Sequence, residues 1–201
     1  MTVEFINDRI EHLRALLRDA AGDVNIAAAL AVSLAQIGQF GEASELLEAA
    51  HARDPQSLPI AHNLAELYRN RGDTKRAEII FHQLISGASP YLPSVVSLIA
   101  LLTQQSDADK KTTFQLARLY AMQGQALRAQ FQYGPAEQAF RQALTYTPDD
   151  SDLQLRLADA TRLMGRPSEA IQMSRAILAR DDRDASSWNN IGCALIELGR
   201  L

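Results

Sequence analysis

Residues 117–150, "ARLYAMQGQALRAQFQYGPAEQAFRQALTYTPDD", contain the pattern that decides the fold. Small residues, Gly124 and Ala136, stand at the eighth and twentieth places, and a large apolar residue, Phe140, stands at the twenty-fourth. Apolar residues recur at three- and four-residue spacing, which is typical of amphipathic helices. Pro148 at the thirty-second place ends the second helix, because proline cannot continue a helix. The stretch therefore predicts one helix, a turn and a second helix.

The same unit recurs along the chain at a period of about 34 residues. Its frames begin at Val24, Leu58, Ala117 and Ser151, and a fifth frame, from Ala185, has only its first half. Two antiparallel helices can approach closely where both carry small side chains. Such residues fill the eighth place (Ala31, Ala65, Gly124, Ala158, Gly192) and the twentieth (Ala43, Ala77, Ala136, Ala170).

The fifteenth place of each frame predicts the turn between the helices. Glycine stands there in four frames, because glycine can adopt, without steric cost, the left-handed conformation that ends a helix. The third frame departs from this rule, because Phe131 takes the glycine's place. The four glycines are Gly38, Gly72, Gly165 and Gly199.

These motifs resemble the tetratricopeptide repeat family. The family pattern W-x-x-L-G-x-x-Y, A-x-x-x-F and P is represented by "YAMQGQAL", "AEQAF" and "TP" in the third frame and by "WNNIGCAL" in the last. The resemblance covers residues 24–91 and 117–201. It implies an all-α fold, a right-handed superhelix, or solenoid, of antiparallel helix pairs.

Two segments lie outside the repeat register. Residues 1–23 predict an amino-terminal capping helix, and residues 92–116 an irregular helical insertion with a helix from Pro93 to Gln104. A long helix should then run from Asp109 to Phe131, because one apolar face continues without interruption. The expected organisation is thus 1–23 cap, 24–91 two repeats, 92–116 insertion, 117–184 two repeats and 185–201 the first helix of an incomplete repeat.

Composition limits the classes of function. The chain has 201 residues, a formal net charge of -4 and a pI near 5.6, which argues against nucleic acid and anionic membranes as partners. The richest apolar stretch, 92–102, is too short to insert into a membrane. The single cysteine, Cys193, suits a reducing compartment, so the cytoplasm is expected; a periplasmic location stays open if a signal peptide was removed.

The sequence predicts neither a catalytic centre nor a cofactor. It contains none of the motifs G-x-x-x-x-G-K-[ST], G-x-G-x-x-G, H-E-x-x-H, G-x-S-x-G or C-x-x-C. His62 and Glu66 stand one helical turn apart, but no third ligand accompanies them, so we interpret them as a surface pair and not as a metal site. We expect no enzyme activity.

The resemblance implies a concave face built from the first helix of each repeat. Transferring the family's groove positions onto this sequence gives these candidate peptide-binding residues: His62, Asn63, Glu66, Arg69, Arg118, Gln125, Arg128, Arg156, Asp159, Arg162, Asn189 and Asn190.

Two features of this candidate set indicate what it would bind. Asn63 and Asn190 stand where some family members hold a peptide backbone with an asparagine ladder, which Met122 and Arg156 interrupt here. Five arginines predict a locally basic face that favours an acidic peptide. They are Arg69, Arg118, Arg128, Arg156 and Arg162.

The leading hypothesis is a protein interaction scaffold, an adaptor that binds an extended peptide segment in the groove. One alternative is the recognition arm of a larger enzyme of glycosyltransferase or sulfotransferase type. Another is self-assembly into a homo-oligomer through the last helix, "SSWNNIGCALIELGRL" (186–201), whose apolar stripe contains Trp188 and Leu195. Because the second helix of this repeat is missing, we expect the repeat itself to leave that stripe uncovered. The chain would then be cut from a longer one, or a partner would shield the stripe. The high content of alanine and arginine is typical of bacterial proteins from GC-rich genomes.

Overall fold

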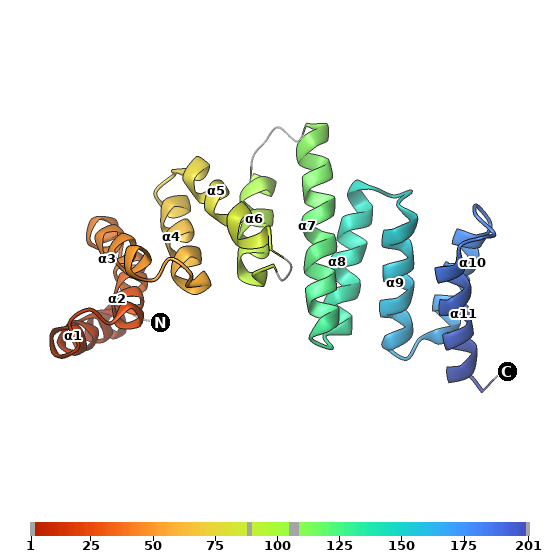
Figure 1. The fold of residues 1–201 in the computed structure, drawn as a ribbon, viewed down its shortest axis with the longest axis horizontal. Helices are drawn as coiled ribbons and strands as arrows, with labels where there is room; N and C mark the ends of the chain where they lie inside the picture. The colour runs from red at the N-terminus through yellow and green to blue at the C-terminus, as the bar shows by residue number, and fades with distance from the viewer. Residues whose placement is uncertain (1–2, 88–89, 105–108, 200–201) are drawn as a thin grey trace. The chain divides into compact units, whose positions relative to one another are not determined.

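The computed structural model describes residues 3–87, 90–104 and 109–199. Within these ranges the regular structure is entirely helical (Figure 1), as predicted. The helices are α1 (Val3–Asp19), α2 (Val24–Gln36), α3 (Phe40–Arg53), α4 (Leu58–Asn70), α5 (Thr74–Ile85), α6 (Leu92–Gln104), α7 (Lys110–Ala129), α8 (Tyr133–Tyr146), α9 (Ser151–Leu163), α10 (Pro167–Leu178) and α11 (Ala185–Glu197).

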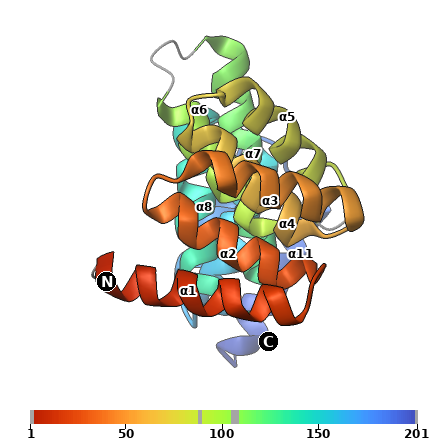
Figure 2. The ribbon, with the colours of Figure 1, turned by 90° about the vertical axis from the view of Figure 1, so that its left-hand side faces the viewer.

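The chain divides into two compact units, Met1–Leu101 and Leu102–Leu201. In the first unit α1 packs on α2, α2 on α3, α3 on α4, and α4 on α5, with α1 alongside α2 at the amino-terminal end (Figure 2). In the second unit each helix from α7 to α11 packs on the next, and α11 also contacts α9. Helices α9 and α11 therefore present one shared face, and the candidate site lies on it.

The alanines at the twentieth place of the repeat are fully buried at helix contacts. Ala43, Ala77, Ala136 and Ala170, at the twentieth place of the four frames, each have 0% exposure, so the predicted close approach is confirmed. Phe140 is also fully buried and packs with alanines and leucines from α8 and α9. The core thus consists of large side chains that fill the space between small ones.

Left-handed residues end the first helix of each pair. The four turn glycines have φ between +65° and +83°, as the sequence predicts. Phe131 also adopts this conformation, with φ +60°, although its side chain is unfavourable there. The ring of Phe131 is 78% exposed and meets the ring of Tyr133 edge-on, with 6.3 Å between the centroids. The turn geometry therefore outweighs the local preference of residue 131.

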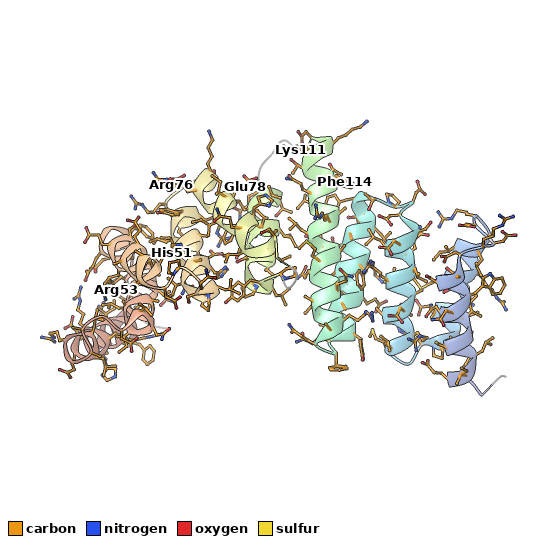
Figure 3. The ribbon with its side chains drawn as sticks, viewed as in Figure 1. His51, Arg53, Arg76, Glu78, Lys111 and Phe114 are labelled. Atoms are coloured by element: carbon orange, nitrogen blue, oxygen red, sulfur yellow. The ribbon has the colours of Figure 1, made fainter. Side chains whose placement is uncertain are left out.

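The middle of the chain contains the two helices that the sequence predicts. Helix α6 begins at Leu92, one residue before its predicted start, and α7 ends at Ala129, two residues before the predicted end. Asp109 begins α7 by accepting a hydrogen bond from the amide of Thr112 at 2.7 Å. Helix α7 has 20 residues against 14 in α8, and its first turns display Lys111 and Phe114 (Figure 3). None of the described helices is both long and apolar enough to cross a membrane.

Candidate functional site

The second unit contains an open hollow of about 500 Å³ between α7, α9 and α11. Six of the predicted groove residues line it, whereas the described side chains of Arg118 and Gln125 lie outside its lining. The six are Arg128, Arg156, Asp159, Arg162, Asn189 and Asn190, and the remaining lining residues are Leu155, Ala185, Ser186 and Cys193.

Helical periodicity brings these residues to one face. Arg156, Asp159 and Arg162 follow at three-residue spacing on α9, so their side chains point the same way. Asn189 and Cys193 stand one turn apart on α11, which packs beside α9. The family's groove positions also include Ser186, Leu155 and Cys193, at the second, fifth and ninth places of their frames. The candidate set omitted these three because it kept mainly large polar side chains.

Asp159 lies between two arginines of the hollow. Its Oδ1 accepts a hydrogen bond from Nη2 of Arg162 at 2.8 Å, and its Oδ2 lies 3.2 Å from Nη1 of Arg128. The carboxylate side chain is 26% exposed. The carboxylate of Asp159 therefore links Arg128 of α7 to Arg162, which lies three residues further along α9.

Arg162 and Asn190 form a second, more deeply buried link. Nε of Arg162 donates to Oδ1 of Asn190 at 3.1 Å, and Nδ2 of Asn190 donates to Oγ of Ser174 at 2.8 Å. Arg162 also forms an ion pair with Glu197. Burial alone lowers the pKa of Arg162, but the hydrogen bonds to Asp159 and Glu197 raise it above its ordinary value. This network joins α9, α10 and α11.

The network changes the predicted roles of two groove residues. The Asn190 side chain already donates to Ser174 and accepts from Arg162, and Asn190 is only 5% exposed. Its amide therefore holds helices together, contrary to the prediction of a ladder residue that holds a peptide backbone. Arg162 has only 14% of its side chain exposed and is likewise a structural group.

The predicted basic face is compensated by carboxylates in the structure. Besides the pairs of Arg128 and Arg162, Arg156 pairs with Asp152 at 2.7 Å and Arg69 pairs with Glu66 at 2.7 Å. Each of these carboxylates stands three or four residues from its arginine, or on a neighbouring helix, so folding brings the opposite charges together. Four of the five arginines therefore have a carboxylate partner within the fold, and the preference for an acidic peptide stays a prediction.

The candidate residues of α4 separate into two environments. Asn63 and Glu66 line a smaller hollow of about 260 Å³ together with Val32 and Gln36 of α2. Arg69 stands on the same helix and holds Glu66 in an ion pair. The first unit therefore has its own hollow, lined by both polar and apolar side chains.

His62 instead packs toward α6. Its Nδ1 lies 3.0 Å from Oγ of Ser94, and its ring meets the rings of Phe81 and Tyr91 at centroid distances of 5.8 and 5.6 Å. Burial lowers the pKa of His62. Among the described residues, no group of three or more His, Cys, Asp or Glu side chains is arranged to hold a metal ion.

The apolar stripe of α11 is partly covered. Ile191 and Ala194 are buried against Ile171 and Leu178 of α10, which corrects the prediction of an uncovered stripe. Trp188 remains 56% exposed, and its indole N–H donates to the carbonyl oxygen of Asp182 at 2.9 Å. Helix α10 therefore covers part of the stripe and leaves Trp188 exposed.

Comparison with known proteins identifies the repeat. The family model described as tetratricopeptide repeat matches residues 34–102 and 127–191, more than half of the chain. No curated protein sequence matches this one. Among solved structures, YrrB, described as a TPR protein with an unusual peptide-binding site, is 15% identical, with a TM-score of 0.42, over 95% of this chain and 86% of its own.

Two further solved structures resemble the chain. TTC0263, a thermophilic TPR protein from Thermus thermophilus, is 23% identical with a TM-score of 0.41, over 86% of this chain and 99% of its own. A tetratricopeptide repeat protein from Parabacteroides merdae is 17% identical with a TM-score of 0.45, over 97% of this chain and 81% of its own. Most of helix α6 lies within the family match, and α6 begins one repeat period after α4.

Proposed function

This chain belongs to the tetratricopeptide repeat family, and on that basis we propose that it is a non-enzymatic scaffold that binds an extended segment of another protein. Members of the family generally mediate protein–protein interactions. The proposed binding site is the hollow of the second unit, lined by α7, α9 and α11. The single, half-buried Cys193 suits the reducing cytoplasm, which is the location we propose.

The observation that carries the proposal is the mixture of side chains along this hollow. Asn189 and Ser186 are exposed at its wall, and each offers both a hydrogen-bond donor and an acceptor. An extended peptide presents amides and carbonyls at regular intervals, which such groups can satisfy. Leu155 adds an apolar surface beside them. The site therefore suits main-chain recognition with a small apolar contact.

Random dodecapeptides displayed on phage and selected against the full chain supply the probes for a test. Synthetic copies of the selected peptides should bind wild-type protein, as measured by fluorescence anisotropy. The double variant Arg156→Ala, Asn189→Ala should weaken binding by about tenfold or more, because it removes two polar contacts from the hollow. The double variant spares Arg162, which the buried network needs.

The matched control is Arg76→Ala on α5 in the first unit. Arg76 has 66% of its side chain exposed and pairs only with its neighbour Asp73 among the described ion pairs. Arg76→Ala removes one positive charge, as Arg156→Ala does, but should leave peptide binding unchanged. Circular dichroism melting should be the same for wild-type and variant proteins. Peptides that bind the double variant as tightly as the wild type would overturn the proposed site.

A further inference from the structure

Asp159 places a negative charge in the lining of the proposed binding site. Both of its oxygens face arginines of the hollow, Arg128 at 3.2 Å and Arg162 at 2.8 Å. Arg162 is additionally held by Glu197 and Asn190, so it cannot turn away from Asp159 without breaking its hydrogen bond to Asn190 and its ion pair with Glu197. The carboxylate of Asp159 is therefore fixed in the wall of the hollow.

The positive charges of the hollow are all compensated. Its three arginines are matched by Asp159, by Glu197 and by Asp152, which pairs with Arg156. The carboxylates differ, however, in how easily their side chains can move. Asp152 has 65% of its side chain exposed and can move away when a ligand approaches Arg156, whereas Asp159, at 26%, is held by two partners. A ligand carboxylate at Arg128 would meet the charge of Asp159 at close range.

From this arrangement we propose that Asp159 determines specificity by excluding acidic peptide segments, so that the groove selects uncharged ones. The inference rests on the proposed peptide-binding function and reverses the acidic preference that the arginines alone predict. Repulsion built against an unwanted ligand is one of the two ways to achieve specificity. Uncharged segments avoid this repulsion and can still use Asn189 and Ser186.

Fluorescein-labelled hexaglutamate and hexaglutamine test this inference, because the two peptides have the same length and nearly the same shape. Wild-type protein should bind hexaglutamine at least as tightly as hexaglutamate. Asp159→Asn should increase the affinity for hexaglutamate by about fivefold or more, with little change for hexaglutamine, because it frees Arg128 and removes the repulsion. The gain should shrink at high salt. Asp159→Ser, which removes the same charge, should give the same shift.

Glu42→Gln is the control, since it removes one charge from an ion pair with Arg14 in the first unit and should change neither affinity. A ratio of the two affinities that is unchanged in both Asp159 variants overturns the inference, as does tighter binding of hexaglutamate by the wild type. Absence of hexaglutamate binding to both variants overturns it as well. Failure of the proposed function gives a different result, because the selected dodecapeptides would then bind the double variant Arg156→Ala, Asn189→Ala as tightly as the wild type.

Discussion

Cε1 of Phe140 lies 2.7 Å from the position that a Cβ atom would occupy at Gly124. Two more carbons of the same ring lie within 2.9 Å of that position, and the ring is fully buried between α7 and α9. A buried ring of this kind cannot retreat without disturbing its neighbours. The close contact of the two helices therefore requires glycine at residue 124.

Gly124→Ala should lower the free energy of unfolding by about 1–3 kcal/mol, because the added methyl group overpacks the core. Urea denaturation followed by circular dichroism measures the change. Gly192→Ala is the matched control at the same place of another repeat, where no atom lies within 4 Å of the added Cβ. This control should raise the free energy of unfolding by up to about 1 kcal/mol through helix propensity. Equal effects of both substitutions would contradict the role of Phe140.

Phe131→Gly should stabilise the protein. Phe131 has φ +60°, and a left-handed conformation costs a non-glycine residue roughly 1–2 kcal/mol. Its ring is 78% exposed and contributes little burial, so the relief of strain should dominate and raise the free energy of unfolding by about 1 kcal/mol. Phe131→Ala keeps the strain and should not stabilise. A lower urea midpoint for Phe131→Gly would show that the contact with Tyr133 outweighs the strain.

His62 should make stability dependent on pH. Burial lowers its pKa, Arg69 lowers it further, and Glu66 opposes both. The folded state therefore binds a proton less readily than the unfolded chain, whose histidine pKa is about 6.5. The stabilisation is complete above that value and is lost as the pH falls toward the lower pKa of the folded state.

Urea denaturation at about pH 7.5 and about pH 5.5 compares the free energy of unfolding above and below the pKa of an unfolded histidine. His62→Gln cannot take up the proton and should lose less stability between the two conditions than the wild type. NMR titration of the His62 ring should give a pKa below that of an unfolded histidine. Equal losses for wild type and variant would exclude His62 as the source.

Asn190→Ala should lower the free energy of unfolding by about 1–3 kcal/mol, because it leaves the Ser174 hydroxyl and Nε of Arg162 without their partner. A double-mutant cycle with Ser174→Ala should show a coupling of about 0.5 kcal/mol or more. Asn189→Ala on the neighbouring exposed position is the control and should change stability little. Additive effects of the Asn190 and Ser174 substitutions would show that their hydrogen bond contributes nothing.

Much of the fold follows from local properties of the sequence. The buried alanines, the turn glycines and the predicted ends of α6 and α7 agree with the structure because each depends on side-chain size, φ preference or capping within one helix pair. The prediction that the apolar stripe of α11 is uncovered was the exception, and it was wrong. The cover of this stripe comes from Ile171 and Leu178 on the preceding helix, a contact between neighbouring repeats.

The positions of groove residues along their helices also follow from periodicity, which is why six of them line one hollow. Which of these residues form hydrogen bonds or ion pairs within the fold does not follow from periodicity. Asp159 stands 31 residues from Arg128, and Asn190 stands 28 residues from Arg162 and 16 from Ser174, so only the packed helices decide which pairs form. The sequence by itself determined the repeat, because close helix packing depends on small residues at a fixed period. Only the tertiary structure decided which polar groups form hydrogen bonds and ion pairs within the fold and which stay exposed in the hollow, because their partners come from different helices.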